Sequence, residues 1–304
     1  MTKTQTLHLH LRLARPDQLL AVTLVYIWGV LLALGHTLPG TAVLPSALAG
    51  LLPLLLVSAS IHYANEYADA ETDALTQRTP FSGGSGALAA FGADRRVALA
   101  DAILSLAAGL VLAALLLWLG WLPPLALGLL LLGALGGWMY SLPPLALAWR
   151  GWGELDNALL GGILLPAYGF AVLVGRLDAA ALWVTLPFAL LVFVNLLATT
   201  WADRAADAQV GKWTLATRWP VRRLRLLYGT AVVLVLLALL ALRGPLLPDP
   251  LFWASLLVLP AALWAGLAYT RRHSPFPSVF TMILFLLVQL GGRLLLAINN
   301  PAAL

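Results

Sequence analysis

The chain has 304 residues, of which 61% are hydrophobic and only 10% are charged, and its mean hydropathy is +0.91. No compact soluble core is large enough to bury that much apolar surface, so the composition excludes a soluble globular protein and predicts a polytopic membrane protein. The net charge is +5, but the basic residues lie beside apolar segments and form no basic face, so the charge does not indicate nucleic-acid binding. The chain contains no cysteine, which excludes disulfides and thiolate metal sites.

The first polar segment, residues 7–15 (LHLHLRLAR), alternates leucine with histidine or arginine. This period of two suits a strand better than a helix. We interpret the segment as an interfacial anchor for the first membrane helix, and metal binding by His8 and His10 is the alternative. The polar N-terminus leads into a span of full length, which argues against a cleaved signal peptide.

Apolar segments then recur along the whole chain, separated by proline, glycine and charge. Each is long enough to cross a bilayer or nearly so, and helices are the default structure in that setting. We therefore predict an all-α protein, a single integral-membrane domain over residues 1–304 with nine transmembrane helices around a central cavity. The predicted spans are 19–38, 42–64, 97–120, 124–140, 157–174, 181–200, 224–242, 251–268 and 279–296.

The basic residues lie mostly on one side of these spans. The N-terminus and the loops after the second, fourth, sixth and eighth spans hold 15 of the 18 lysines and arginines. By the positive-inside rule, the N-terminus and these loops are cytoplasmic and the C-terminus is outside. Most acidic residues fall on the same side, so we expect a multi-pass protein of the cell (inner) membrane with a cytoplasmic active site.

The second span ends in an acidic stretch, NEYADAETD. Asn65, Asp69 and Asp73 follow one another at intervals of four, so a helix that continues past the interface places all three on one stripe. Like charges at this spacing destabilise a helix. We expect a cation to neutralise them.

A glycine-rich segment, FSGGSGAL, follows this stripe. Backbone N–H groups at Gly83, Gly84 and Gly86 can cradle a phosphate, and a plain flexible loop has the same composition. The sequence leaves both readings open.

The sixth span ends in a second acidic pair, Asp203 and Asp207, again four residues apart. Two such pairs facing each other across a cavity offer the hard oxygen ligands that Mg²⁺ prefers, with substrate phosphate completing its coordination. The alternative is that both helix ends are simply polar because they reach the interface. Basic side chains nearby can meet the remaining phosphate charge. These are Arg78, Arg150, Arg204, Lys212 and Arg218.

Four further polar residues lie in or beside the spans near this side. His62 and Asn195 are functional candidates or interhelical hydrogen-bonding groups. Glu154 and Asp156 can orient Arg150 or accept a proton, and the sequence does not choose between these roles.

Taken together, these motifs resemble the UbiA superfamily of intramembrane aromatic prenyltransferases. Asn65, Asp69 and Asp73 match the superfamily's N-x-x-x-D-x-x-x-D signature, and Asp203 and Asp207 match its D-x-x-x-D signature. The following segment GKWTLATRWP is similar to G-K-R-T-L-A-x-x-x-G, and YSLPPLALAWRGWGELDNALLGG resembles the loop after the fourth helix.

The resemblance implies two Mg²⁺ ions held by the four aspartates, with Asn65 positioning metal or phosphate, and a polyprenyl diphosphate donor whose tail lies among the helices. Tyr140 and Arg150 contact the diphosphate in that scheme. This chain departs from the superfamily at Pro144, where many members have lysine, and at Thr200 and Ala202, where some have asparagine and arginine.

The implied reaction is Mg²⁺-assisted loss of diphosphate, attack of an aromatic ring on the allylic cation, and loss of the ring proton. GKWTLATR and TPFSGGSG look closest to the MenA-like branch, whose acceptor is 1,4-dihydroxy-2-naphthoate in menaquinone biosynthesis. Relatives acting on 4-hydroxybenzoate, homogentisate, chlorophyllide or haem share the motifs. From another class, a cation-coupled transporter also has many spans, but its ionisable groups belong near the bilayer midplane.

Overall fold

The computed structural model of the chain describes residues 2–37 and 40–299, and almost all of this part is helical. Apart from two isolated bridges, the described residues contain no strand. Three short segments have other helical geometry: η1 (Leu34–His36) and η2 (Leu147–Trp149) are 3₁₀ helices, and η3 (Leu160–Leu164) is a π-helix. The α-helices are α1 (Lys3–Leu13), α2 (Pro16–Ala33), α3 (Val43–Ala68), α4 (Ala70–Leu75), α5 (Ala87–Phe91), α6 (Arg96–Trp118), α7 (Pro124–Ser141), α8 (Gly153–Leu159), α9 (Leu165–Val174), α10 (Ala179–Gln209), α11 (Leu215–Arg218), α12 (Val221–Leu242), α13 (Asp249–Leu256), α14 (Val258–Ala268) and α15 (Phe276–Asn299).

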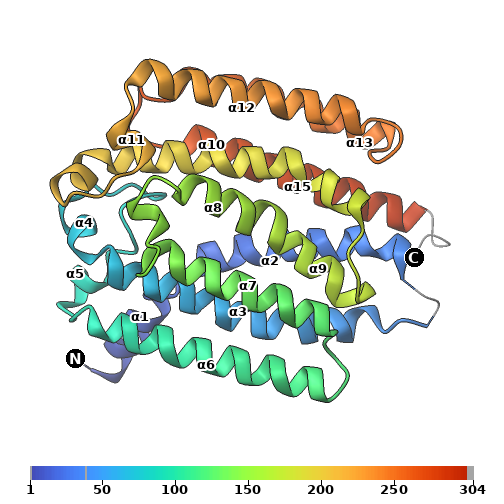
Figure 1. The fold of residues 1–304 in the computed structure, drawn as a ribbon, viewed down its shortest axis with the longest axis horizontal. Helices are drawn as coiled ribbons and strands as arrows, with labels where there is room; N and C mark the ends of the chain where they lie inside the picture. Colours follow the sequence, from blue (N-terminus) through green and yellow to red (C-terminus); the bar gives the residue numbers. More distant parts are fainter. Residues whose placement is uncertain (1, 38–39, 300–304) are drawn as a thin grey trace.

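Nine helical stretches within the described residues are long and apolar enough to cross a membrane. They lie side by side along the long axis of the molecule, as Figure 1 shows. The predicted all-α fold with nine spanning helices is therefore confirmed. The spans are Pro16–His36, Val43–Ala68, Arg96–Trp118, Pro124–Ser141, Gly153–Val174, Ala179–Gln209, Val221–Leu242, Asp249–Ala268 and Phe276–Ile298.

Helix α1 corrects the strand-like reading of the first segment. The Thr2 hydroxyl accepts a hydrogen bond from the Gln5 amide, and the Gln5 side-chain oxygen accepts one from the Thr2 amide, so a capping box starts a helix. Leu9 and Leu13 are buried four residues apart, whereas Leu7 and Leu11 are exposed. The alternation therefore gives one buried and one exposed leucine stripe on an interfacial helix.

The two histidines of α1, His8 and His10, lie in different surroundings. The His10 ring pairs with Asp101 of α6, and the Tyr63 hydroxyl donates to the His10 carbonyl oxygen at 3.1 Å. His8 is exposed. This arrangement agrees with the interpretation of the segment as an anchor against the bundle.

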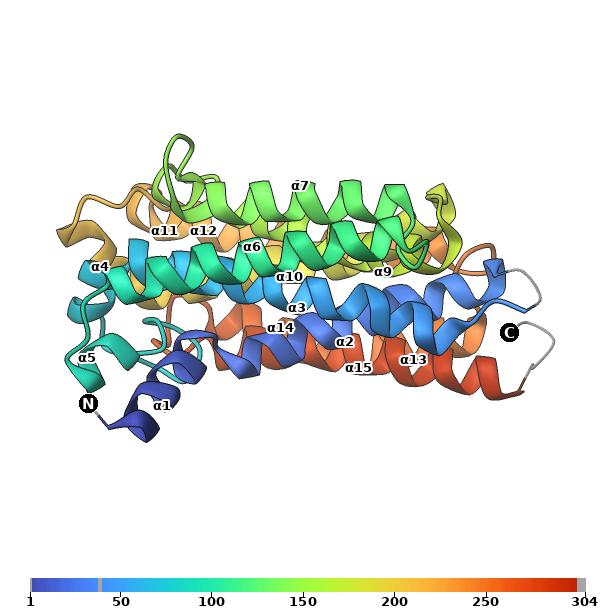
Figure 2. The same cartoon turned by 90° about the horizontal axis from the view of Figure 1, so that it is seen from below.

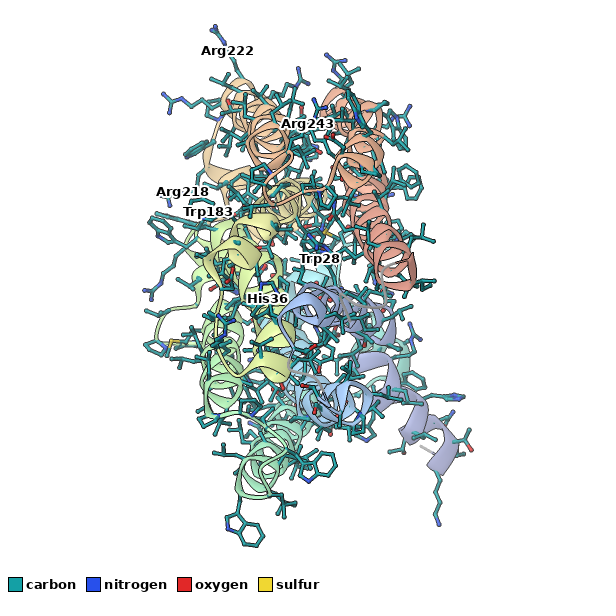
Figure 3. All side chains as sticks on the ribbon, turned by 90° about the vertical axis from the view of Figure 1, so that its right-hand side faces the viewer. Trp28, His36, Trp183, Arg218, Arg222 and Arg243 are labelled. Carbon is teal, nitrogen blue, oxygen red and sulfur yellow. The ribbon has the colours of Figure 1, made fainter. Side chains whose placement is uncertain are left out.

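The core lies between the spans rather than in a separate layer. Trp28 of α2 is fully buried and packs edge-on to Phe188 of α10 and Phe285 of α15, with ring centroids 5.5 and 6.4 Å away. Figure 3, which looks along the bundle, places Trp28 among the helices. A Cβ on Gly29 would overlap the Pro166 backbone, so glycine permits the close approach of α2 and α9.

One end of the bundle gathers the short elements. Helices α1, α4, α5 and α11 lie at the end where Figures 1 and 2 mark the N-terminus, and α15 ends at the opposite side. Both aspartate motifs belong to this end, because α3 leads into α4 and α10 leads into α11.

Candidate active site

The first aspartate motif straddles a break between α3 and α4. Asp69 caps α3, but its amide still donates to the Asn65 carbonyl oxygen at 2.9 Å, and the Asp73 amide donates to the Asp69 carbonyl oxygen at 2.8 Å. The turn spacing therefore persists across the break. The Asn65 amide also donates to Asp69 Oδ2 at 2.8 Å and to the Ser141 hydroxyl at 3.1 Å.

The second motif lies wholly within α10, which continues to Gln209, well past the predicted end of its span at residue 200. Asp203 and Asp207 are thus held on one helical stripe. Asp207 is buried and Asp203 is partly buried.

Lys212 joins the two motifs. Its Nζ lies 3.0 Å from both carboxylate oxygens of Asp69 and 3.7 Å from Asp207 Oδ1, although Asp69 precedes Lys212 by 143 residues. A turn after α10, in which the Lys212 amide donates to the Asp207 carbonyl oxygen at 2.9 Å, points the lysine back at the aspartates. The structure therefore brings the two motifs together around one ammonium group.

The charges at this site are strongly coupled. Burial opposes a charged Lys212, but the charges of Asp69 and Asp207 outweigh it and hold the pKa of Lys212 above its usual value. Burial, with repulsion from Asp69, raises the pKa of Asp73 to about 7. The raised pKa of Asp73 means that a further negative charge is disfavoured in this cluster, and an added cation would favour the ionised form.

The glycine-rich loop packs between the two motifs. Gly84, at φ +64°, lies so close to Asp73 that an added Cβ would overlap its carboxylate. The Ser82 hydroxyl and Gly83 amide face the Asp203 carboxyl. Arg78 shapes this loop, because its guanidinium donates to the carbonyl oxygens of Gly83 at 2.9 Å and Gly84 at 2.8 Å.

A buried ion pair that the sequence analysis missed secures the same loop. Arg15 Nε donates to Glu66 Oε1 at 2.7 Å, and the two carboxylate oxygens of Glu66 accept from the Ser85 amide and hydroxyl, each at 2.7 Å. We call this arrangement the Arg15–Glu66–Ser85 latch. Burial lowers the pKa of Arg15, but the charges of Glu66, Asp73 and Asp69 together outweigh burial and raise it. The only sequence signal was an acid next to Asn65.

Two residues that flank the loop between α7 and α8 reach the site. Tyr140, at the end of α7, is partly buried and interacts electrostatically with Lys212 and Asp69. Glu154 is buried and accepts from the Leu215 amide at 3.3 Å and the Thr200 hydroxyl at 3.4 Å, which ties α8 to α10 and α11.

The other predicted basic residues are not brought to the aspartates. Among the described residues, none of Arg150, Arg204 and Arg218 pairs with a carboxylate of the two motifs. Arg204 stacks on Trp201, 3.6 Å from the ring centroid. Arg150 is exposed, and its carbonyl oxygen accepts from Arg218 at 3.5 Å. Arg218 lies at the periphery of the bundle (Figure 3).

The fit of a metal ion can be judged from the oxygen atoms. Within the described residues, no three histidine or acidic side chains already converge at ligand distance. However, Asp203 Oδ1 and Asp207 Oδ1 are buried without a hydrogen-bond partner. The donor set consists of hard carboxylate oxygen atoms, which fits Mg²⁺.

Comparison with solved structures shows proteins of the same fold. The chain is similar to a UbiA homolog from Archaeoglobus fulgidus whose structure was solved with DMAPP and Mg²⁺ bound, with 22% identity, a TM-score of 0.67, and coverage of 93% of this chain and 98% of that chain. A digeranylgeranylglyceryl phosphate synthase structure has 16% identity and a TM-score of 0.64 (94% and 98% covered). A UbiA homolog from Aeropyrum pernix K1 has 14% identity and a TM-score of 0.65 (93% and 98% covered).

No sequence among curated proteins matches this chain. The sequence model of the UbiA prenyltransferase family, however, matches residues 22–292, which include every span but the start of the first and the end of the last. Together with nine spanning helices in the described residues and the two facing aspartate motifs, this match establishes that the chain belongs to the UbiA prenyltransferase family.

Proposed function

We propose that this prenyltransferase moves a polyprenyl group from a polyprenyl diphosphate to an aromatic acceptor. The contact that carries the proposal is that of Lys212 with Asp69 and Asp207. It gathers acidic groups from two distant helices at one end of the bundle, where the charged head of a lipid-like donor lies when its tail is in the bilayer.

In this proposal, the four aspartates with Asn65 hold two Mg²⁺ ions. When bound, Mg²⁺ neutralises charge that builds up on the departing diphosphate. Lys212 and Tyr140 meet the diphosphate at the end of the bundle where the aspartates lie, and the Ser82–Gly84 backbone lies against it. The helix bundle keeps water from the allylic cation. Arg78, Arg150, Arg204 and Arg218 stay predicted substrate contacts. Arg78 also holds the glycine-rich loop in shape through its hydrogen bonds to the Gly83 and Gly84 carbonyl oxygens.

For the acceptor, we propose 1,4-dihydroxy-2-naphthoate, as in the MenA-like branch and menaquinone biosynthesis. The segments GKWTLATR and TPFSGGSG support this choice. Structures of the Archaeoglobus fulgidus homolog were solved with DMAPP or GPP together with Mg²⁺, which supports a prenyl diphosphate donor. Other aromatic acceptors are the alternative.

We further propose that residues 1–304 form one integral-membrane domain with its N-terminus and active site in the cytoplasm and its C-terminus outside. The distribution of lysine and arginine supports this orientation. The position of the aspartates at one end of the bundle also argues against a cation-coupled transporter, whose sites lie near the bilayer midplane.

The test is release of diphosphate from geranylgeranyl diphosphate by the purified protein, with and without Mg²⁺. Asp69→Asn and Asp207→Asn are expected to lower the rate at least 100-fold, because each removes a carboxylate of the shared cluster. Asp249→Asn is the control, since Asp249 pairs with Arg243 outside this cluster, across the bundle. A rate that is indifferent to both Mg²⁺ and Asp69 would contradict the proposal.

A further inference from the structure

Two facing helices carry buried polar atoms that the described residues leave without a partner. Asp156 Oδ2 on α8 and Asn195 Oδ1 on α10 are buried and have no hydrogen bond. A buried acceptor without a donor costs roughly 1–3 kcal/mol, so natural proteins rarely retain one unless something else binds there. Neither residue is used by the aspartate and lysine cluster described above.

The two residues lie in the same stretch of contact between neighbouring helices. Helix α8, continued by η3, runs antiparallel to α10, because Glu154 meets Thr200 at one end and Gly161 faces Val192 at the other. Asp156 and Asn195 fall between these two contacts. Asn195 precedes Asp203 by eight residues, which is about 12 Å along a helix at 1.5 Å per residue.

Their position is next to the proposed diphosphate site. The Tyr140 hydroxyl interacts electrostatically with Asp156 and with Lys212 and therefore connects the two regions. The π-helix η3 (Leu160–Leu164) begins one turn after Asp156. Such π-helical turns are frequent at functional sites.

Glu154 and Asp156 have different surroundings, which separates two acids that the sequence did not distinguish. Glu154 accepts hydrogen bonds from the Leu215 amide and the Thr200 hydroxyl and so holds α8 against α10 and α11. Asp156 Oδ2 has no hydrogen-bond partner and remains available to a ligand.

The chemistry of these atoms selects among the possible ligands. An ionised carboxylate only accepts hydrogen bonds. The oxygens of a diphosphate also only accept, and a prenyl chain has no donor. The remaining substrate, an aromatic ring with hydroxyl groups, supplies the missing donor.

We propose that Asp156, with Asn195, binds a hydroxyl group of the aromatic acceptor and takes its proton during transfer. The C–O bond to diphosphate breaks, and diphosphate leaves with the electron pair of that bond. As the O–H bond of the acceptor breaks, its electrons are delocalised into the ring, and a ring carbon forms a bond to the allylic carbon. That ring carbon then loses its hydrogen as a proton to the released diphosphate, or its carboxylate as CO2 where it carries one. The electron pair left behind restores the aromatic ring, and Asp156 returns the proton to the oxygen. This inference rests on the proposed function and assigns the acceptor side of the same site.

The test compares 1,4-dihydroxy-2-naphthoate and 4-hydroxybenzoate with their O-methyl ethers. A methyl ether still donates electrons to the ring but has no proton to give. The wild-type protein is expected to prefer the free hydroxyl by at least 100-fold in kcat/KM. Asp156→Asn is expected to reduce this preference below tenfold, and Asn195→Leu to raise KM for the acceptor about tenfold without changing KM for the prenyl diphosphate.

The control is Glu154→Gln, which is expected to lower thermal stability but to keep the hydroxyl preference. If Asp156→Asn does not fold, Asp156→Glu keeps a carboxylate and is expected to keep the preference at a lower kcat. An unchanged preference in Asp156→Asn, with diphosphate release intact, overturns this inference alone and leaves a buried water as the partner of Asp156. Absence of diphosphate release from the wild-type protein overturns the proposed function and this inference with it.

Discussion

At the scale of single residues, Lys212 has the largest effect on the charge of the site. It is 8% exposed and lies between carboxylates from two motifs, so its ammonium partly neutralises them. From the sequence, Lys212 was predicted only as one of several basic residues that meet the phosphate charge of the substrate. Its direct pairing with Asp69 depends on two segments 143 residues apart meeting in space.

Replacing this lysine should make folding depend on Mg²⁺. Lys212→Met leaves buried carboxylates without their cation, and loss of one partner of a buried ion pair typically costs about 3–5 kcal/mol. We expect a lower Tm in Mg²⁺-free buffer and a larger Mg²⁺-induced rise in Tm than in the wild-type protein, because an ion that binds only the folded state stabilises it. Thermal unfolding in detergent across a Mg²⁺ titration measures both. Lys3→Met, at the exposed N-terminus, is the matched control, and equal Mg²⁺-free Tm values for the two variants would contradict the idea.

At the scale of elements, the Arg15–Glu66–Ser85 latch connects three segments. Arg15 begins α2, Glu66 lies in the last turn of α3, and Ser85 belongs to the glycine-rich loop. Arg12 of α1 adds a hydrogen bond to the Ser85 carbonyl oxygen at 3.2 Å. The latch therefore holds the loop over Asp73 and Asp203, and the interfacial helix takes part in it.

Glu66→Gln should loosen this loop. The change removes the charge that Arg15 faces in a buried setting, with side-chain exposures of 14% for Arg15 and 3% for Glu66. We expect hydrogen exchange over residues 76–86 to become at least tenfold faster, along with weaker diphosphate binding. Glu71→Gln is the control, because Glu71 pairs with Arg95 on the surface and such pairs are worth about 0–1 kcal/mol. The same exchange rates in both variants would show that the latch does not order the loop.

At the scale of the whole molecule, both aspartate motifs meet at one end because their spans run in the same direction. The second and sixth spans, α3 and α10, both end where α1, α4, α5 and α11 gather (Figure 1). An even number of crossings between them returns the chain to the same side. Span count and charge distribution alone predict this side.

The absence of cysteine makes the orientation directly testable. Ser274 lies in the loop between the eighth and ninth spans, and Leu177 lies in the loop between the fifth and sixth spans. The two test variants are Ser274→Cys and Leu177→Cys. In intact cells, a membrane-impermeant maleimide is expected to label the cysteine at 177 and not the one at 274. Lysed cells supply the control: residues 177 and 274 are both exposed, so both cysteines should react with the maleimide once the membrane is broken. The reverse pattern in intact cells would invert the proposed topology.

Sequence alone therefore determined the membrane class, the nine spans and the two aspartate motifs, because hydropathy and helical spacing are local properties of the chain. The side of the membrane on which the motifs lie stays a prediction from the charge distribution. Tertiary structure decided which side chains join the site. Lys212 reaches Asp69, and Arg15 finds Glu66, whereas Arg204 turns to Trp201 and Arg218 to the periphery. These choices depend on how helices distant in sequence pack against one another. A side chain's direction follows from that packing, and no spacing along the chain encodes it.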